Sequence, residues 1–370
     1  VIVGVAGGLF GCAAVQGERT GGAAAAVAAC TGCEPFETTG SVVLRGGTVV
    51  GLGRADVVIQ DGRITDVSLG AAAEGIEVVD VTGRYLVPGF IDSHVHLAYL
   101  PESAALLDRG VVGVVDLAAP LSFLAEDLAP MQVIASGPMV TAVGGYPTQS
   151  WGRNGYGAES SDANSAEDTV DMVISAGARV VKLPVTPDPQ LSPAALLAAT
   201  ARAHDRGVKV VSHALSDAEA STAAVAGVDA LAHTPTESLS PATLTLWSDR
   251  VVISTLAAFG GSDSTVANLA ALHAAGTTVL YGTDFGNRNE VGIDPDEVAL
   301  LQAAGLSAAQ ILASATAVPA AYFGFEGLGE IAVGARGSVV VLSRDPLVDI
   351  RVLAEPESVY VDGVRRGSTE

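Results

Sequence analysis

Short apolar segments with strand periodicity alternate with apolar, alanine-rich segments of helical length through the middle of the chain. The first strand is expected at 88–94, within an apolar–polar alternation over 90–97 that indicates one buried face. Later strands are expected at Val111–Asp116, Gln132–Ser136, Ala178–Leu183, Val208–His213, Asp229–His233, Val251–Thr255 and Thr277–Asp284. Helices are expected at Ser192–Asp205, Asp217–Ala226, Pro241–Trp247 and Thr265–Ala275. Strands joined by helical crossovers predict an α/β protein with a closed parallel (β/α)8 TIM barrel.

Both ends of this alternating region carry β-like patterns separated by glycines and polar turns. Strands are expected at Val42–Leu44, Thr48–Val50, Asp56–Ile59, Ile331–Gly334, Ser338–Leu342 and Val359–Val364. The pairs Asp61-Gly62 and Asp362-Gly363 are typical hairpin turns. Because the two ends of a domain commonly lie close together, we expect one small β-sandwich built from both. The expected boundaries are 41–85 and 329–370 for the sandwich and 86–328 for the barrel.

Composition and charge limit the classes of binding partner that the sequence supports. The chain has 370 residues, is 49% hydrophobic and has a formal net charge of −22, with lysine only at 182 and 209. This charge disfavours nucleic acid and anionic membranes as partners. No apolar run has the length of a transmembrane span, and no glycine-rich nucleotide-binding motif occurs. We therefore expect a small-molecule or short-peptide substrate, and a homo-oligomer stays open.

The first forty residues differ from the rest and are expected to lie outside the folded body. Val27–Cys30 resembles a bacterial lipoprotein cleavage box, and Leu9–Cys12 is a poorer match. If this segment is an export signal, the protein is periplasmic or lipid-anchored through Cys12 or Cys30; a low-complexity tail would leave it cytoplasmic. Cys30 and Cys33 form a C-x-x-C pair, but no second pair completes a zinc site.

The candidate chemistry lies at the predicted carboxyl ends of the strands, where barrels of this kind carry their active sites. His94 and His96 share one strand face and form a two-nitrogen clamp suited to zinc. His213, His233 and Asp284 end three later strands, although Asp284 has the alternative role of capping the next element. The two remaining histidines, His204 and His273, fall in helical runs and are expected at the surface or in packing.

Lys182 ends the fourth strand of the expected barrel in the apolar company of a buried strand. A buried lysine without an acidic sequence neighbour is costly unless it is neutral or modified. Reaction with CO2 converts such an amine to a carbamate, which offers oxygen ligands to two cations. The alternative is a lysine that extends from the strand end into solvent.

Together these residues resemble the amidohydrolase superfamily of metal-dependent hydrolases, particularly its imidazolonepropionase-like and Xaa-Pro-dipeptidase-like branch. The resemblance covers about residues 41–366. It rests on Val87–Leu97, Val181-Lys182, Ser212-His213, Ala232-His233, Gly282–Asp284 and Gly329–Leu342, and Gly144–Pro147 resembles the branch's glycine-rich segment. The family usually has aspartate where Ser338 stands, a position that touches no metal.

The resemblance implies a binuclear centre with two divalent ions, zinc above all. A buried ion would take His94, His96, carbamylated Lys182 and Asp284. An exposed ion would take His213, His233 and the same carbamate. It also implies that a metal-bridging hydroxide attacks the substrate, that Asp284 carries the proton as the catalytic residue, and that Asp92 orients a ligand from behind.

Substrate choice is expected to depend on the long segment Gly137–Ser165. Tyr146, Trp151 and Tyr156 are candidates for lining the pocket, and Arg153 is a candidate for meeting a substrate carboxylate; the alternative is a surface lid. The expected reaction is hydrolysis of a C–N bond in an amide, peptide or cyclic amide. Lactone or phosphotriester hydrolysis, a mononuclear deaminase-like enzyme and an inactive binding protein stay open, and Glu219 is the acid closest after His213 for the deaminase.

Overall fold

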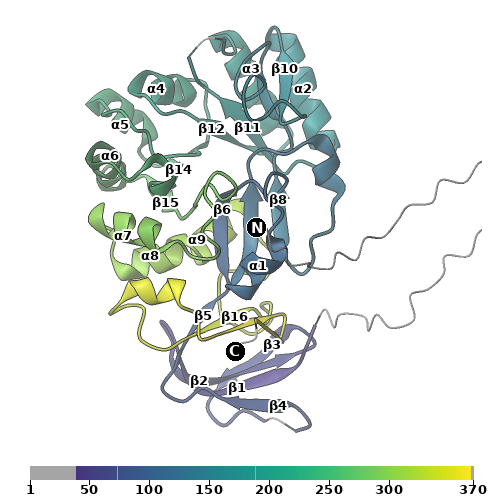
Figure 1. Ribbon diagram of the computed structural model, residues 1–370, viewed down its shortest axis with the longest axis vertical. Coiled ribbons are helices and arrows are strands. Elements are labelled where there is room, and N and C mark those ends of the chain that lie inside the picture. The colour runs from purple at the N-terminus through teal and green to yellow at the C-terminus, as the bar shows by residue number, and fades with distance from the viewer. Residues whose placement is uncertain (1–38, 73, 188, 368–370) are drawn as a thin grey trace, which may run out of the picture. The chain divides into compact units, whose positions relative to one another are not determined.

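Parallel strands from the middle of the chain form two sheets that follow sequence order (Figure 1). The computed structural model describes residues 39–72, 74–187 and 189–367, all within one compact unit, Glu37–Glu370. One sheet contains β6 (Phe90–Val95), β7 (Val111–Asp116) and β8 (Gln132–Ala135). The other contains β11 (Val180–Pro184), β12 (Lys209–His213), β13 (Ala230–Leu231), β14 (Val251–Ile253) and β15 (Thr278–Leu280).

Backbone hydrogen bonds connect these two sheets at both of their edges. Arg179 N, just before β11, donates to Ala135 O of β8 at 3.0 Å. At the other edge Ser93 N of β6 donates to Tyr281 O at 3.0 Å, and Asp284 N donates to His94 O at 2.9 Å. The first and last parallel strands are therefore linked through the segment that follows β15, which brings their carboxyl ends together.

Helices follow most of these strands and begin at residues suited to a helix start. Ser192, Ser240 and Asp294 accept hydrogen bonds from backbone N–H groups of α3, α5 and α7, each of which has proline in its first turn. The helices are α1 (Ser103–Asp108), α2 (Ala163–Ser175), α3 (Pro193–Asp205), α4 (Asp217–Val225), α5 (Pro241–Trp247), α6 (Asp263–Ala274), α7 (Pro295–Ala303), α8 (Ala308–Ser314) and α9 (Ala317–Phe323). Short 3-10 helices are η1 (Leu121–Ala125), η2 (Ala257–Phe259) and η3 (Ile350–Ala354). Figure 1 shows α4–α8 on the outer side of the strands.

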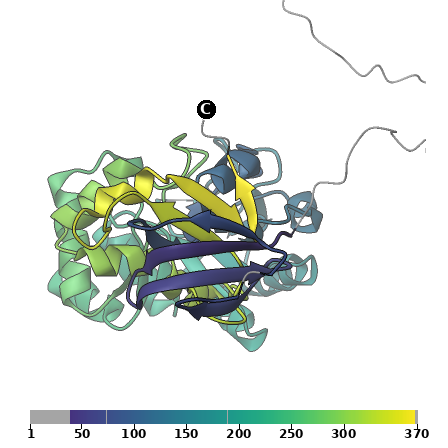
Figure 2. The same ribbon diagram turned by 90° about the horizontal axis from the view of Figure 1, so that it is seen from below.

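Both ends of the described chain contribute to one mixed sheet of eight strands. Its strands are β1 (Val42–Val49), β2 (Gly53–Gln60), β3 (Arg63–Ser68), β4 (Glu77–Asp80), β5 (Tyr85–Pro88), β16 (Val339–Leu342), β17 (Ser358–Val361) and β18 (Val364–Arg366). In Figure 2 the yellow β16 lies beside the blue strands of the N-terminal half, and β16 pairs antiparallel with β5. The expected union of the two ends is thus present as one sheet, whereas its arrangement as a sandwich stays a prediction.

The two predicted Asp-Gly hairpins are present. Asp61 and Gly62 have φ of +48° and +80°, and Asp362 and Gly363 have φ of +49° and +78°, as a tight primed turn requires. The strand expected at Ile331–Gly334 is wrong: this segment has no strand structure. Gly334 N bonds Ile64 O at 2.8 Å, Ile64 N bonds Ala335 O at 2.9 Å, and Arg63 and Arg336 form an isolated antiparallel bridge, so pairing with β3 is limited to the few residues from Gly334 onward.

The segment 137–165 is not the long loop that its glycines and aromatic residues indicate. It contains the parallel pair β9 (Met139–Ala142) and β10 (Gly157–Ser160), and α2 begins at its end. The apolar–polar alternation in β10 is too short to be recognised in the sequence. The pair forms because the apolar residues of β9 are buried. None of the helices in the described ranges is long and apolar enough to cross a bilayer.

Candidate metal centre

Three side chains from the two linked strand ends form a compact group of metal-binding type. His94 and His96 lie on β6 and just after it, and Asp284 lies in the segment after β15. The Nε2 atoms of His94 and His96 are 3.4 and 3.0 Å from the same oxygen, Asp284 Oδ1. All three residues are buried. The predicted two-histidine clamp therefore faces a carboxylate that the sequence places far downstream.

The backbone of Asp284 turns sharply, and this turn aims its carboxylate at the histidines. Its φ is +60°, a conformation that aspartate tolerates better than most residues. Asn287 Nδ2 donates to both carboxylate oxygens at 3.1 Å. Burial by itself would raise the pKa of Asp284, but the electrostatic attraction of the His94 ring and the hydrogen bonds from His96 and Asn287 outweigh it and hold the pKa below its ordinary value. The carboxylate is thus kept ionised.

Two further histidines, His213 and His233, lie beside this group of three residues. The ring centroid of His233 is 4.5 Å from that of His94 and 4.9 Å from that of His213. His94 Nδ1 donates to Ala232 O at 2.9 Å, and His233 Nδ1 lies 2.9 Å from Thr255 Oγ1. Burial lowers the pKa of His213 to about 3 and those of His94 and His233 well below the ordinary value. All three rings are therefore neutral at physiological pH, the form in which imidazole can bind a metal.

Lys182 is fully buried on β11, and a positive charge on its amine would lower the pKa of His94, His213 and His233. The charges of Asp284 and Asp116 act on the amine in the opposite sense and favour its protonated form. Nζ has no hydrogen-bond partner among the described residues. Burial lowers the pKa of Lys182 to about 7, so a large part of the amine is uncharged at neutral pH.

Two buried carboxylates hold the strand ends from behind. Asp92 accepts hydrogen bonds from His94 N at 3.0 Å and from Thr283 Oγ1 at 2.6 Å. Asp116, at the end of β7, accepts one from Leu97 N at 2.7 Å. Burial raises the pKa of Asp92 to about 7 and that of Asp116 to about 6. Asp92 thus ties β6 to the segment that carries Asp284, in the place expected for a residue that orients a ligand.

The aromatic residues expected at the substrate pocket adjoin the histidines. The ring of Tyr146 lies 4.9 Å from that of His213, and Trp151 lies 5.1 Å from His96. Trp151 Nε1 donates to the Tyr146 hydroxyl at 2.9 Å, and Tyr156 packs against Trp151 at 5.3 Å. Burial raises the pKa of Tyr146 to about 12, which keeps its hydroxyl protonated. Arg153, by contrast, is exposed and donates to Gln149 O at 3.1 Å.

The two histidines expected at the surface or in packing lie there. Exposed His204 pairs with Asp229 at 2.9 Å, and half-buried His273 bonds Gln310 at 3.1 Å. Glu219 accepts from Ser216 N at 2.9 Å in the capping box at the start of α4. Glu219 is thus engaged in capping α4, whereas a deaminase-like reaction would use an acidic residue after His213 for proton transfer.

The donor set fits divalent cations. Imidazole nitrogens, a carboxylate and an amine able to form a carbamate are ligands that zinc accepts. The buried atoms His94 Nε2 and Lys182 Nζ have no hydrogen-bond partner within the described part of the chain, a costly arrangement unless another group satisfies them. The expected C-x-x-C of Cys30 and Cys33 and the cleavage boxes lie outside the described residues.

A sequence model of the amidohydrolase family matches residues 85–366, which include every residue of this centre. The chain belongs to the amidohydrolase family. The family membership predicted from the sequence is confirmed. Among curated relatives, the dihydroorotase of Bacillus cytotoxicus is 43% identical over 51 residues, 14% of this chain and 11% of the relative. The D-hydantoinase of Ralstonia pickettii is 41% identical over 59 residues, 15% of this chain and 13% of the relative. The matched segments thus span only a small part of these relatives.

Solved structures resemble this amidohydrolase over most of its length. A Xaa-Pro dipeptidase with bound methionine has a TM-score of 0.76 at 19% identity, covering 89% of this chain and all (100%) of that chain. The ochratoxinase of A. niger has a TM-score of 0.74 at 19% identity, covering 89% of this chain and 96% of that chain. These likenesses establish the shared fold, including that of a Xaa-Pro dipeptidase as expected from the sequence.

Several residues near the centre of the amidohydrolase were not singled out from the sequence. Asn287, Thr255 and Asp116 each contact a predicted ligand or the turn that carries one. Thr255 and Asp116 stand at the ends of predicted strands, and this position is the sequence signal that could have identified them. Asn287 follows Asp284 by three positions, but nothing local indicates that its amide turns back toward the carboxylate.

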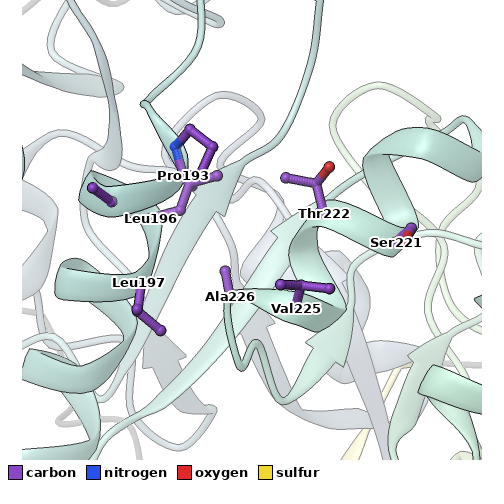
Figure 3. A pocket seen from close by; sticks show the side chains of 8 residues that line it. Pro193, Leu196, Leu197, Ser221, Thr222, Val225 and Ala226 are labelled. Atoms are coloured by element: carbon purple, nitrogen blue, oxygen red, sulfur yellow. The ribbon is translucent and has the colours of Figure 1, made fainter.

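A separate hollow lies between α3 and α4, and none of the histidines lines it (Figure 3). Its volume is about 430 Å3 and its lining is mostly apolar: Pro193, Ala194, Leu196, Leu197, Ser221, Thr222, Val225 and Ala226. No titratable side chain is among these lining residues. The hollow therefore lacks groups for acid–base or metal chemistry.

Proposed function

We propose that this amidohydrolase is a metal-dependent hydrolase of C–N bonds in amides, peptides or cyclic amides, with a binuclear centre. The observation that carries the proposal is Lys182, a fully buried amine without a hydrogen-bond partner among the described residues. Burial lowers its pKa to about 7, and its charge interacts with that of Asp284. Only an uncharged amine reacts with CO2. Formation of the N–C bond releases the amine proton and leaves a carbamate anion, which replaces a costly buried cation with a ligand.

The ligand assignment rests on the family resemblance and is supported by the buried group of His94, His96 and Asp284. His94, His96, Asp284 and the Lys182 carbamate would hold one divalent ion, with zinc the first candidate. His213, His233 and the same carbamate would hold the second. The hydrogen bonds from His94 Nδ1 to Ala232 O and between His233 Nδ1 and Thr255 support Nε2 as the ligand atom of these two rings.

The bound ions supply Lewis acidity, which polarises a carbonyl and lowers the pKa of a water molecule. Asp284, kept ionised by His94 and His96, accepts the proton of the attacking water. It then delivers this proton to the leaving nitrogen as the C–N bond breaks. Water thus adds its hydroxyl group to the acyl carbon and its other proton to the leaving nitrogen, so the reaction balances.

Aromatic side chains are proposed to receive the apolar part of the substrate. Tyr146 and Trp151 adjoin His213 and His96, so a substrate held for attack would lie against their rings. Tyr156 supports Trp151 from behind. Arg153 is retained as the candidate partner of a substrate carboxylate, as hydrolysis of short peptides would require. The fold of the Xaa-Pro dipeptidase supports that substrate class.

The edge hydrogen bonds described above also support a closed (β/α)8 barrel over 86–328. We propose that the mixed sheet forms the small β-sandwich module, with parts at 41–85 and 329–370. Its buried side chains Leu44, Ile59 and Val341 belong to one apolar cluster drawn from both chain ends, which supports a single module.

Metal content per chain tests the proposal, with Lys182→Ala as the decisive variant. The purified protein should hold about two equivalents of zinc-type metal. Lys182→Ala should lower this content and remove most amidase activity, and short-chain carboxylic acids should restore part of both by occupying the carbamate's place. Lys209→Ala is the matched control, since it removes the only other lysine, which is exposed.

The outcomes separate the competing functions. About one equivalent of metal, unchanged in Lys182→Ala, would favour the mononuclear deaminase-like enzyme. No bound metal and no hydrolysis would favour a binding protein. Full activity of Lys182→Ala would contradict the binuclear assignment.

A further inference from the structure

Thr255 holds a backbone conformation that its own side chain disfavours. Its φ is +43°, in the left-handed region, where a β-branched residue is an outlier. The other non-glycine residues with positive φ among the described residues are all aspartates, Asp61, Asp249, Asp284 and Asp362, a type that tolerates this region. Thr255 therefore stands in a conformation that its position must enforce.

The chain is fastened on both sides of Thr255. Thr255 N donates to Gly282 O at 3.1 Å, and Ser254 N donates to Leu280 O at 2.9 Å. The next two N–H groups, of Leu256 and Ala257, donate to the two carboxylate oxygens of Glu297 at 3.0 and 2.7 Å. Glu297 is fully buried, although it takes no part in the proposed reaction. These contacts hold the strained conformation in place.

What this conformation provides is a contact with a proposed ligand. Thr255 Oγ1 lies 2.9 Å from His233 Nδ1, and both residues are buried. When Nδ1 donates to this oxygen, Nε2 keeps a free lone pair for a metal. His94 obtains the same arrangement from a backbone carbonyl, Ala232 O. His233 depends instead on a side-chain hydroxyl, which a substitution can remove.

We infer that Thr255 is a positioning residue, which fixes the ring orientation and tautomer of His233. Its strained backbone conformation is retained because it makes this contact possible. The inference rests on the proposed metal centre. It assigns a role to the buried Glu297 as well, because the two N–H bonds to its carboxylate keep Thr255 in this conformation.

Four substitutions separate the hydroxyl from the strain. Thr255→Ser keeps the hydroxyl, and Thr255→Val keeps the shape without it. Thr255→Ala and Thr255→Gly both lack the hydroxyl and differ mainly in tolerance of positive φ. Thr277→Val is the matched control: Thr277 is also buried, and its hydroxyl donates to Trp247 O at 2.9 Å just before β15, at the opposite end of that strand from Asp284.

The experiment uses the full chain stripped of metal and titrated with Zn2+ against a chromophoric chelator. Thr255→Val should bind the weaker Zn2+ equivalent about 10- to 100-fold less tightly than the natural protein. Thr255→Ser and Thr277→Val should stay within about threefold. In thermal unfolding of the metal-free proteins, Thr255→Gly should melt above Thr255→Ala, the reverse of the order expected in ordinary backbone.

Each measurement has a result that would contradict the part of the inference that it tests. Natural affinity in Thr255→Val would refute the positioning role while leaving the metal centre intact. A higher melting temperature for Thr255→Ala than for Thr255→Gly would refute the strain. Failure of the natural protein itself to take up Zn2+ would overturn both this inference and the proposed function.

Discussion

The mixed sheet and the parallel strands both bury polar side chains, but they satisfy them differently. In the sheet, buried Asp56 accepts from Gly46 N at 2.8 Å and from Gly70 N at 3.0 Å. Asp362 is held there by an ion pair with Arg336. At the ends of the parallel strands, His94 Nε2, His96 Nδ1 and Lys182 Nζ have no hydrogen-bond partner among the described residues.

This difference distinguishes buried polar groups that stabilise the fold from buried polar groups that are available to bind a ligand. A buried polar group without a partner costs more than a satisfied one contributes, so a folded chain normally removes such groups or pairs them. Asp56 and Asp362 follow that rule within the sheet. The strand ends of the centre break it with several nitrogens at one place, which indicates that an external ligand completes their coordination.

The largest expected effect lies on the functional side. Asp284→Asn keeps the shape and one carbonyl oxygen but loses the proton acceptor. We expect kcat to fall by about 100-fold or more, with only a modest loss of metal, because removal of a general base has that scale. Steady-state kinetics beside metal analysis checks this, and the acidic limb of the pH–rate profile should change as well. A variant that keeps normal metal and more than about a tenth of kcat would reduce Asp284 to a ligand, and His233 would be tested next.

The corresponding change in the sheet should affect stability alone. Arg336→Met leaves Asp362 buried and unpaired, and it also removes the bond from Arg336 to Pro130 O. We expect a loss of about 3 kcal/mol in the free energy of unfolding, measured in urea, with unchanged metal content. Arg351→Met is the control, since its exposed pair with Asp349 should contribute under about 1 kcal/mol. Loss of metal in Arg336→Met would show that the two regions are coupled.

Glu297 allows a test by pH of a buried carboxyl behind the centre. Burial raises its pKa from 4.5 to about 7, against the opposing backbone hydrogen bonds from Ala257 and Leu256. Between these values the folded protein holds a proton that the unfolded chain has lost, so this contribution to stability falls as the pH rises from 4.5 to about 7. Glu297→Gln removes the titration. Its stability relative to the natural protein should rise across that window, and a pH-independent difference would contradict the prediction.

The smallest effect is expected at the aromatic wall. Trp151→Phe keeps a ring beside His96 but loses the hydrogen bond to the Tyr146 hydroxyl, whereas Trp151→Ala removes both. Loss of an aromatic contact of about 1 kcal/mol should raise KM roughly fivefold in Trp151→Ala, with kcat little changed. Trp151→Phe should lie between that variant and the natural protein. An unchanged KM in Trp151→Ala would place the substrate elsewhere.

Much of the arrangement was predictable because it depends on local periodicity. The apolar patterns located all eight strands of the three- and five-stranded parallel sheets, and Val111–Asp116 was placed to the residue. His94 and His96 followed from the two-residue period of one strand. The β9–β10 pair escaped prediction because four-residue strands carry little periodic signal. Ile331–Gly334 resembles a strand but is hydrogen-bonded to β3 only through its last residue, Gly334.

The sequence by itself determined which side chains end each parallel strand, because strand period and burial are written in neighbouring residues. The tertiary structure alone decided which of those ends meet. Asp92 and Thr283 are 191 positions apart yet bond at 2.6 Å, and this contact helps to bring Asp284 to the two histidines. The left-handed backbone of Thr255 likewise depends on Gly282 and Glu297 from other elements. Such conformations carry no local signature, since only distant packing and hydrogen bonds hold a residue where its own propensity would not place it.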